Sequence, residues 1–172
     1  MAAAVIFCAV SMVSAQAPDF SGTWQLDEAK SKVIATAGVV GLIPAGAPKV
    51  LHITQPANGT VVIESQVNEA HVRIYKPGRE TSTPAGQGGA VTMSSKWDGK
   101  SLVAEGALKA PNGDTTTVRE VVTLGGDGKT LTMEVTTKAA ASAEGSASTL
   151  VYSKITDVGP CEKWPTPCKR WP

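Results

Sequence analysis

The sequence predicts an all-β protein in which about eight to nine antiparallel strands follow one another as a meander and close into a barrel. No segment repeats its apolar residues with the 3.6-residue period of a helix. Short runs rich in Val, Thr, Ile and Leu instead alternate with polar residues, and turn signals separate these runs. Closure into a barrel removes the two open edges that such a meander would otherwise expose. An open β-sandwich is the alternative architecture.

The first half of the chain contains four predicted strands and one long loop. Leu51 and Ile53 fall on one face of a predicted strand. The Asn58-Gly59 dipeptide predicts a hairpin turn, because both residues tolerate a positive φ. The stretch 81–89 is rich in Pro, Gly, Ser and Thr and predicts a loop. The strands expected here span residues 22–26, 50–55, 61–67 and 70–75.

The second half is more regular and alternates strands with short turns. Turns are expected at Asp98-Gly99 and within 111–114 and 126–128, where Asn, Asp and Gly cluster. The small-residue stretch 139–147 predicts a longer loop. The strands expected here span residues 91–97, 101–108, 115–124, 130–137 and 148–155.

Composition limits the size, the partners and the interior of this protein. The 172 residues are enough for one domain with a sizeable core. With 16 Lys and Arg against 15 Asp and Glu, the net charge is +1, which provides no general attraction to nucleic acid. Aromatic residues make up only 5% of the chain, so Val, Ile and Leu must build most of the core. Small lining residues leave room in a barrel that a Phe-rich core would fill.

The N-terminus has the features of a secretory signal peptide. Residues 1–18 carry no charged side chain, and 2–13 form an apolar stretch interrupted only by Ser11. A small-x-small pattern ending at Ala15 predicts cleavage after that residue. We therefore expect a signal peptide over 1–15, a periplasmic or secreted protein, and no transmembrane segment after cleavage. An uncleaved anchor is the alternative, but the run is shorter than the roughly 20 residues that span a bilayer.

The rest of the chain divides into a β-barrel domain over 16–158 and a C-terminal tail over 159–172. Cleavage of the signal peptide leaves two cysteines, Cys161 and Cys168, and an even pair in an exported protein predicts a disulfide. If the disulfide forms, we expect its closed loop to stabilise the protein by about 2.5 kcal/mol. A free or metal-bound pair is the alternative. The tail also carries two Trp-Pro pairs, which either cap the barrel or form a recognition surface.

The segment 19–27 resembles the opening of lipocalin-like proteins, whose first strand carries a Gly-x-Trp motif matched here by Gly22 and Trp24. The chain also resembles a set of bacterial exported proteins of unknown function. These combine that opening with later Trp-Asp-Gly and Asp-Gly-Lys-Thr-Leu hairpins, matched here at 97–99 and 127–131. The resemblance implies a lipocalin-like barrel and indicates little about activity.

The resemblance also implies structural roles for four residues. In lipocalins the motif's Trp packs across the closed end of the barrel, and a basic residue near the last strand covers it. Trp24 matches the first role, and Lys154 takes the place of the arginine usually found in the second. Gly22 and Trp97 belong to the matched motifs and are expected to be structural as well.

The sequence contains no recognisable catalytic, metal or cofactor site. His52 and His71 lie in predicted strands, and two imidazoles are too few for a metal centre. Asp98, Asp114 and Asp127 lie in turns, where aspartate is favoured for local hydrogen bonds. Neither a Gly-x-Ser-x-Gly elbow nor a phosphate-binding glycine loop is present. We expect a protein without cofactor or metal that is not an enzyme.

One further segment suggests a functional role. The 16 residues of 33–48 carry no charge, and they follow the first strand, where a loop at the barrel mouth would fall. Val39, Leu42 and Ile43 are its candidate ligand-contacting residues, in a mobile lid or a docking patch. A short helix or loop packed on the barrel is the alternative.

These features predict an exported, monomeric β-barrel that binds an apolar or amphipathic small molecule. The alternative is a non-enzymatic interaction or structural module of the cell envelope that uses the loop 33–48 and the Trp-Pro tail. Cavity volume separates the two, because a ligand site needs a pocket of a few hundred Å³. The sequence specifies neither the ligand nor the partner.

Overall fold

The computed structural model describes residues 17–34, 47–66, 70–85 and 89–156. These residues form ten antiparallel strands connected by turns and loops. The part of the chain that is described contains no helix with the length and apolarity that crossing a bilayer requires. The strands are β1 (Gly22–Leu26), β2 (Val50–Thr54), β3 (Val61–Gln66), β4 (Ala70–Tyr75), β5 (Glu80–Ala85), β6 (Gly89–Asp98), β7 (Ser101–Lys109), β8 (Thr115–Leu124), β9 (Thr130–Ala139) and β10 (Ser146–Thr156).

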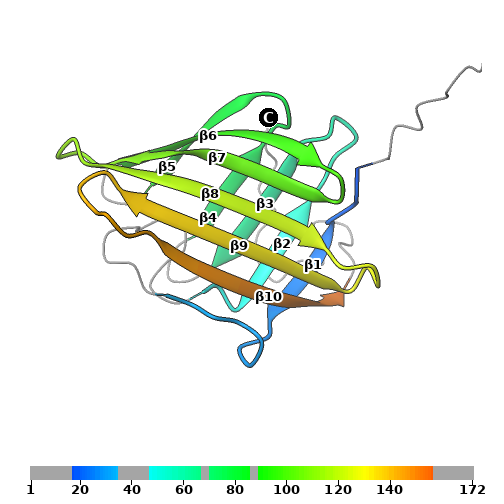
Figure 1. The fold of residues 1–172 in the computed structure, drawn as a ribbon. Coiled ribbons are helices and arrows are strands. Elements are labelled where there is room, and N and C mark those ends of the chain that lie inside the picture. Colours follow the sequence, from blue (N-terminus) through cyan, green and yellow to red (C-terminus); the bar gives the residue numbers. More distant parts are fainter. Residues whose placement is uncertain (1–16, 35–46, 67–69, 86–88, 157–172) are drawn as a thin grey trace, which may run out of the picture.

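All ten strands belong to one sheet that curls into a nearly closed barrel (Figure 1). Their order is β4-β3-β2-β1-β10-β9-β8-β7-β6-β5, so the first and last strands of the chain pair with each other. The two edge strands, β4 and β5, contact each other without joining in the ladder of hydrogen bonds. The predicted all-β meander and its curling into a barrel are confirmed, although the barrel is nearly rather than fully closed, and the sheet has ten strands where about eight to nine were expected.

The additional strand is β5, which lies where the sequence predicted a loop over 81–89. It pairs with β6 in a regular antiparallel register that includes Thr81 opposite Met93 and Thr83 opposite Val91. Pro84 has no amide hydrogen to donate, but an edge strand needs to pair on one side only. The loop prediction was wrong because pairing with the long neighbour β6 outweighs the local preference of Pro, Gly and Ser.

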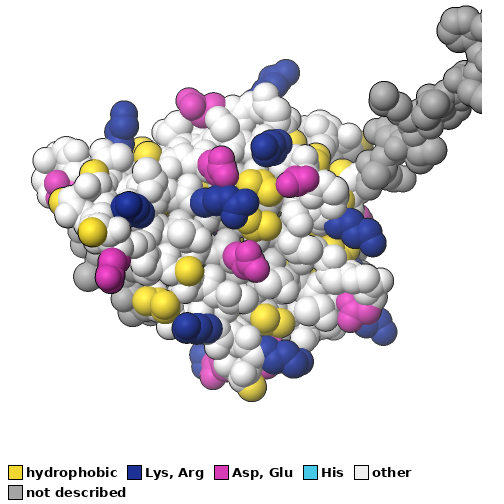
Figure 2. Space-filling model, viewed as in Figure 1, with side chains coloured by type: hydrophobic (Ala, Val, Ile, Leu, Met, Phe, Trp, Pro, Cys, Tyr) yellow, Lys and Arg dark blue, Asp and Glu magenta, His cyan; other side chains and the backbone are white. Residues whose placement is uncertain are grey.

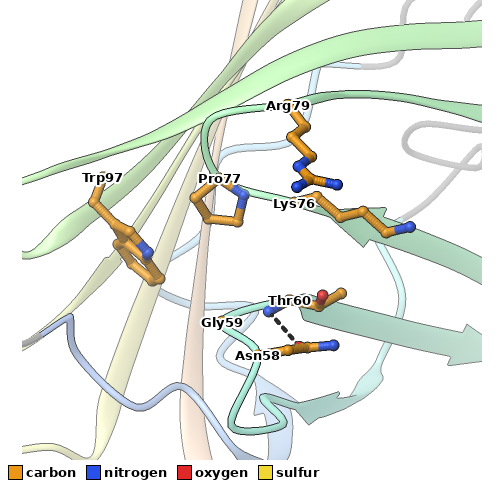
Figure 3. A pocket seen from close by; sticks show the side chains of 7 residues that line it. All are labelled: Asn58, Gly59, Thr60, Lys76, Pro77, Arg79 and Trp97. Carbon is orange, nitrogen blue, oxygen red and sulfur yellow. Dashed lines mark hydrogen bonds between the residues drawn. The ribbon is translucent and has the colours of Figure 1, made fainter.

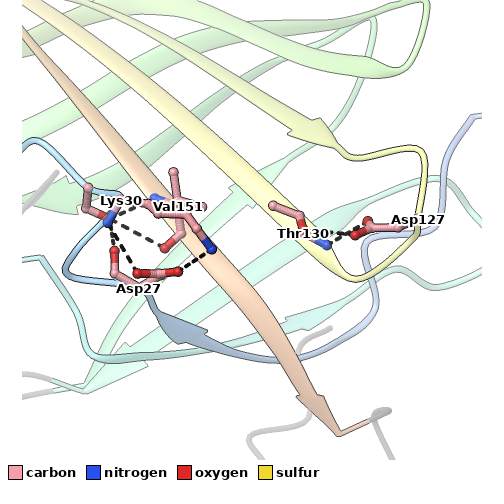
Figure 4. Close-up of polar contacts among 6 residues, drawn as sticks. Asp27, Lys30, Asp127, Thr130 and Val151 are labelled. Carbon is pink, nitrogen blue, oxygen red and sulfur yellow. Dashed lines mark hydrogen bonds and ion pairs between the residues drawn. The ribbon is translucent and has the colours of Figure 1, made fainter.

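Tight turns join the strands at the sites where Asn, Asp and Gly were found. Gly59 and Gly99 have φ values of 78° and 57°, in the left-handed region that glycine adopts at no steric cost. Asp127 closes its turn by accepting a hydrogen bond from the backbone amide of Lys129 at 2.9 Å. It also accepts one from the backbone amide of Thr130 at 3.1 Å (Figure 4). These local hydrogen bonds hold the pKa of Asp127 below its usual value. The aspartate therefore acts as a turn residue.

The inward faces of the strands form one apolar core. Small and branched side chains from all parts of the sheet contribute to it, as the composition predicted. The two tyrosines are also buried, and the hydroxyl of Tyr152 donates to the carbonyl of Pro48 at 3.1 Å. The largest apolar and aromatic side chains that are almost completely buried are Trp24, Tyr152, Phe20, Ile53, Leu102, Leu131, Leu150, Val61 and Val122.

The strand β7 approaches β6 too closely at Gly106 to admit a side chain. A Cβ built on Gly106 would lie 1.9 Å from the carbonyl oxygen of Thr92, which is backbone and cannot move aside alone. We expect Gly106→Ala to lower the free energy of unfolding by about 1–3 kcal/mol, measured by urea denaturation. Gly126→Ala is the control, because a Cβ at Gly126 would meet nothing within 4 Å. Equal stability of the two variants would contradict this prediction.

Candidate functional site

One end of the barrel is closed by aromatic side chains. The indole Nε1 of the fully buried Trp24 donates to the carbonyl of Phe20 at 2.9 Å. The Lys154 Nζ lies 5.6 Å from the centre of the Trp24 ring, within the range of a cation–π contact. Phe20 meets Trp97 edge to face, with ring centroids 5.3 Å apart. Gly22 begins β1 beside this group and pairs with Ile53.

A buried polar cluster crosses the interior of the barrel. Arg73 and Tyr75 project inward from β4, and Glu120 projects inward from β8. These two strands are not neighbours, since β3, β2, β1, β10 and β9 separate them in the sheet. The guanidinium Nη1 of Arg73 donates to one carboxylate oxygen of Glu120, and the hydroxyl of Tyr75 donates to the other. The Glu120 side chain is 1% exposed and that of Arg73 is 13% exposed.

The cluster holds one positive and one negative charge. Burial disfavours the charge of Arg73, but the attraction of Glu120 outweighs it and raises the pKa of Arg73 above its usual value. Burial, followed by the charge of Glu120, raises the pKa of Tyr75, so its hydroxyl remains protonated at neutral pH. The cluster is therefore a neutral unit made of a cation, an anion and a phenol.

Two buried polar atoms in the described residues have no hydrogen-bond partner there. They are Nη2 of Arg73 and Oγ of Ser95. Ser95 pairs with Ala104, and Ala104 pairs with Glu120, so Ser95 and Glu120 lie in one row across β6, β7 and β8. Native structures leave few buried polar groups unsatisfied, and each such group requires an explanation. Polar groups of this kind in an apolar interior are typical of a small-molecule site.

Sequence reasoning did not identify this cluster, although β8 carried a signal for it. Val118 and Val122 alternate on the inward face, and Glu120 occupies the position between them. The period of a strand therefore points the carboxylate inward. Its partners lie 47 and 45 positions away in the sequence, and only the closure of the barrel brings them together.

The two histidines lie on β2 and β4. His52 is buried, and its Nδ1 lies 3.2 Å from Oγ1 of Thr23 on the neighbouring strand β1. Burial lowers the pKa of His52. His71 lies on β4, opposite Ser65. Within the described ranges, no group of three His, Cys, Asp or Glu side chains is arranged to hold a metal ion.

Two surface hollows lie at the ends of the strands. The first has a volume of about 460 Å³ and lies beside the closed end, between the turn at Asn58 and Gly59, the turn carrying Lys76 and Arg79, and Trp97 (Figure 3). The second has a volume of about 700 Å³ and lies between the β7–β8 turn and the end of β9. Exposed or half-buried side chains line nearly all of both hollows, which distinguishes them from the buried interior cluster.

The loop predicted at the barrel mouth lies in sequence between Leu26, the last residue of β1, and Val50, the first residue of β2. Its candidate residues Val39, Leu42 and Ile43 lie outside the described residues. At the edge of this segment, Val33 and Ile34 are each 40% exposed, and the amide of Ile34 donates to Oγ of Ser148 at 2.9 Å.

Several other predicted features also lie outside the described residues. These are the signal peptide over 1–15 and the cysteine pair Cys161 and Cys168.

On the face of the barrel seen in Figure 2, acidic and basic side chains are interspersed. This distribution provides no single-sign surface for a nucleic acid on that face.

Solved structures with the same architecture include several lipid-binding proteins. A structure titled "REP1-NXSQ fatty acid transporter" has a TM-score of 0.55 and 13% identity, over 81% of this chain and 98% of that one. Lipid binding protein 8 of Caenorhabditis elegans has a TM-score of 0.54 and 12% identity, over 79% and 95%. Fatty-acid-binding protein 1 of Echinococcus granulosus has a TM-score of 0.51 and 17% identity, over 79% and 97%.

The sequence comparisons add no closer relative. No protein-family model matches the chain, and no curated protein matches it. At identities of 12–17%, the structural likeness establishes the fold and not the ligand. The chain therefore has the β-barrel fold of the calycin type.

Proposed function

We propose that this protein is an exported β-barrel binding protein that holds an apolar or amphipathic small molecule inside the barrel. The observation that carries the proposal is the polar cluster of Arg73, Tyr75 and Glu120 within an apolar interior. One nitrogen of its guanidinium remains available as a hydrogen-bond donor. An apolar enclosure with a few orienting polar groups is the usual design of a small-molecule site. Proteins of this fold whose titles name fatty acids or lipids support the same function.

Titration with an apolar fluorescent probe, followed by displacement with unlabelled amphiphiles, tests this proposal. Ala104 is 1% exposed and lies on the inward face between Ser95 and Glu120. We expect Ala104→Leu to weaken probe binding at least about tenfold, because the added side chain occupies the interior. Ala147→Leu, on the exposed face of β10, is the control and should bind as the wild type does. Failure of the wild type to bind any apolar probe would refute the proposal.

Export forms the second part of this proposal and rests on the sequence of residues 1–15. Expression of the full chain in a bacterial host with cell fractionation tests it. We expect the protein outside the cytoplasm with its N-terminus at residue 16. An intact Met1 on the exported protein would refute cleavage.

A second candidate is the interaction module of the cell envelope. The exposed Val33 and Ile34, at the start of the apolar segment 33–48, are the observation in its favour. Deletion of residues 35–45 separates the two functions. On the small-molecule proposal, the deletion changes the entry and release rates of the probe. If the protein is instead an interaction module, the deletion abolishes its association with the cell envelope, and neither the wild type nor the deletion variant binds the probe.

A further inference from the structure

The charge of the only buried guanidinium in the described interior is already balanced. Glu120 accepts hydrogen bonds from Arg73 through one oxygen and from Tyr75 through the other. Both oxygens of the carboxylate are therefore engaged, and its charge lies directly against the cation. Because the phenol of Tyr75 is neutral, the three side chains together carry no net charge.

An ionised ligand would disturb this balance. A carboxylate brought to Arg73 would lie beside Glu120 and leave a net negative charge in an apolar interior. Removal of a charge from water is costly unless an opposite charge compensates it. Two carboxylates that share a single cation also repel each other. The ion pair between Arg73 and Glu120 thus disfavours an anionic head group.

A neutral head group with an oxygen acceptor meets no such penalty. The buried Nη2 of Arg73 offers N–H groups that no described residue accepts, and an uncharged oxygen can accept from them. The hydroxyl of Ser95, which also lacks a partner in the described chain, can both donate and accept. Alcohol, ester and amide oxygens satisfy these groups without adding a charge.

We infer that the interior site selects a neutral, oxygen-bearing amphiphile, such as a long-chain alcohol, ester or amide, over the ionised carboxylate of the same chain length. This inference rests on the proposed small-molecule function and specifies the chemical class of its ligand. Its structural basis is the carboxylate of Glu120, which already balances the charge of the guanidinium and leaves only the uncompensated N–H groups of Nη2 for a ligand.

Displacement titrations with dodecanol, methyl dodecanoate and dodecanoate test this inference on the wild-type protein. At about pH 8 the free dodecanoate is ionised. We expect the alcohol or the ester to bind at least about tenfold more tightly than dodecanoate. Because this ranking needs no variant, it does not depend on how any substitution affects folding.

The variant Glu120→Gln removes the negative charge of the cluster, so that its net charge changes from zero to +1, while it preserves the size of the side chain. It leaves Arg73 as an uncompensated cation, so dodecanoate should bind at least about tenfold more tightly than to the wild type. The matched control is Glu134→Gln on β9, where the glutamate is exposed. The control should leave the wild-type ranking unchanged.

The outcomes of these titrations distinguish failure of this inference from failure of the proposed small-molecule function. A wild type that binds dodecanoate as tightly as dodecanol, or more tightly, overturns the neutral-ligand inference and leaves the small-molecule function intact. If no probe binds to the wild type or to a folded Glu120→Gln variant, the proposed function fails, and the inference fails with it.

Discussion

Replacing Glu120 with methionine is expected to lower the free energy of unfolding by about 3–5 kcal/mol. The substitution preserves approximate volume but removes the only anion in contact with Arg73 among the described residues. The guanidinium then remains inside the barrel without a counter-ion, and the hydroxyl of Tyr75 loses its acceptor. Urea denaturation followed by far-UV circular dichroism measures the effect.

A double-variant cycle identifies the cause of this loss. The combined change Arg73→Met and Glu120→Met removes both charges but still leaves the hydroxyl of Tyr75 without its acceptor, so we expect it to recover about half or more of the lost stability. Glu134→Met on the exposed face of β9 should change stability by less than about 0.5 kcal/mol. If the single and double variants are equally unstable, the loss comes from packing and not from the unpaired charge.

Truncation of Trp24 to alanine is the second substitution with a large expected effect, about 3–5 kcal/mol of unfolding free energy. The Trp24 side chain is fully buried, and its indole nitrogen donates a hydrogen bond to the Phe20 carbonyl. Its removal leaves a cavity at the closed end and leaves that carbonyl without its donor. Thermal and urea denaturation of the variant measure the loss.

Two matched variants test this interpretation. Trp24→Phe retains much of the ring, so it should cost less than the alanine variant, and the lost hydrogen bond accounts for about 0.5–1.5 kcal/mol of that cost. Trp97→Ala should also cost less than Trp24→Ala, because the Trp97 side chain is only partly buried. A Trp24→Ala protein as stable as Trp97→Ala would show that the closed end does not depend on Trp24.

These substitutions also distinguish stability from ligand selection at the same site. A buried ion pair contributes little to stability compared with well-packed apolar residues, although loss of one partner is costly. A small net contribution of this ion pair to stability is what the proposed role of Arg73 and Glu120 in ligand selection leads us to expect. The double methionine variant tests this directly, because it should fold well and lose discrimination between the alcohol and the carboxylate.

Local sequence patterns were sufficient to predict most strands and the turns between them. Alternation of apolar and polar residues marks the two faces of a strand, and Asn-Gly, Asp-Gly and similar pairs mark the turns where φ becomes positive. Both signals act over a few residues, so a single sequence contains them completely. The strands β1, β4 and β8 accordingly begin and end where the pattern predicted.

Features that depend on partners far along the chain required the folded barrel. The strand β5 forms because β6 offers a long edge to pair with, whereas the short polar sequence of β5, which contains Pro84, by itself favours a loop. The cluster joins β4 to β8, because Arg73 and Tyr75 contact Glu120 from 47 and 45 positions away in the sequence. Alternation indicates that each side chain points inward, but only closure of the sheet determines which inward-facing residues meet, because that depends on the register and curvature of all ten strands.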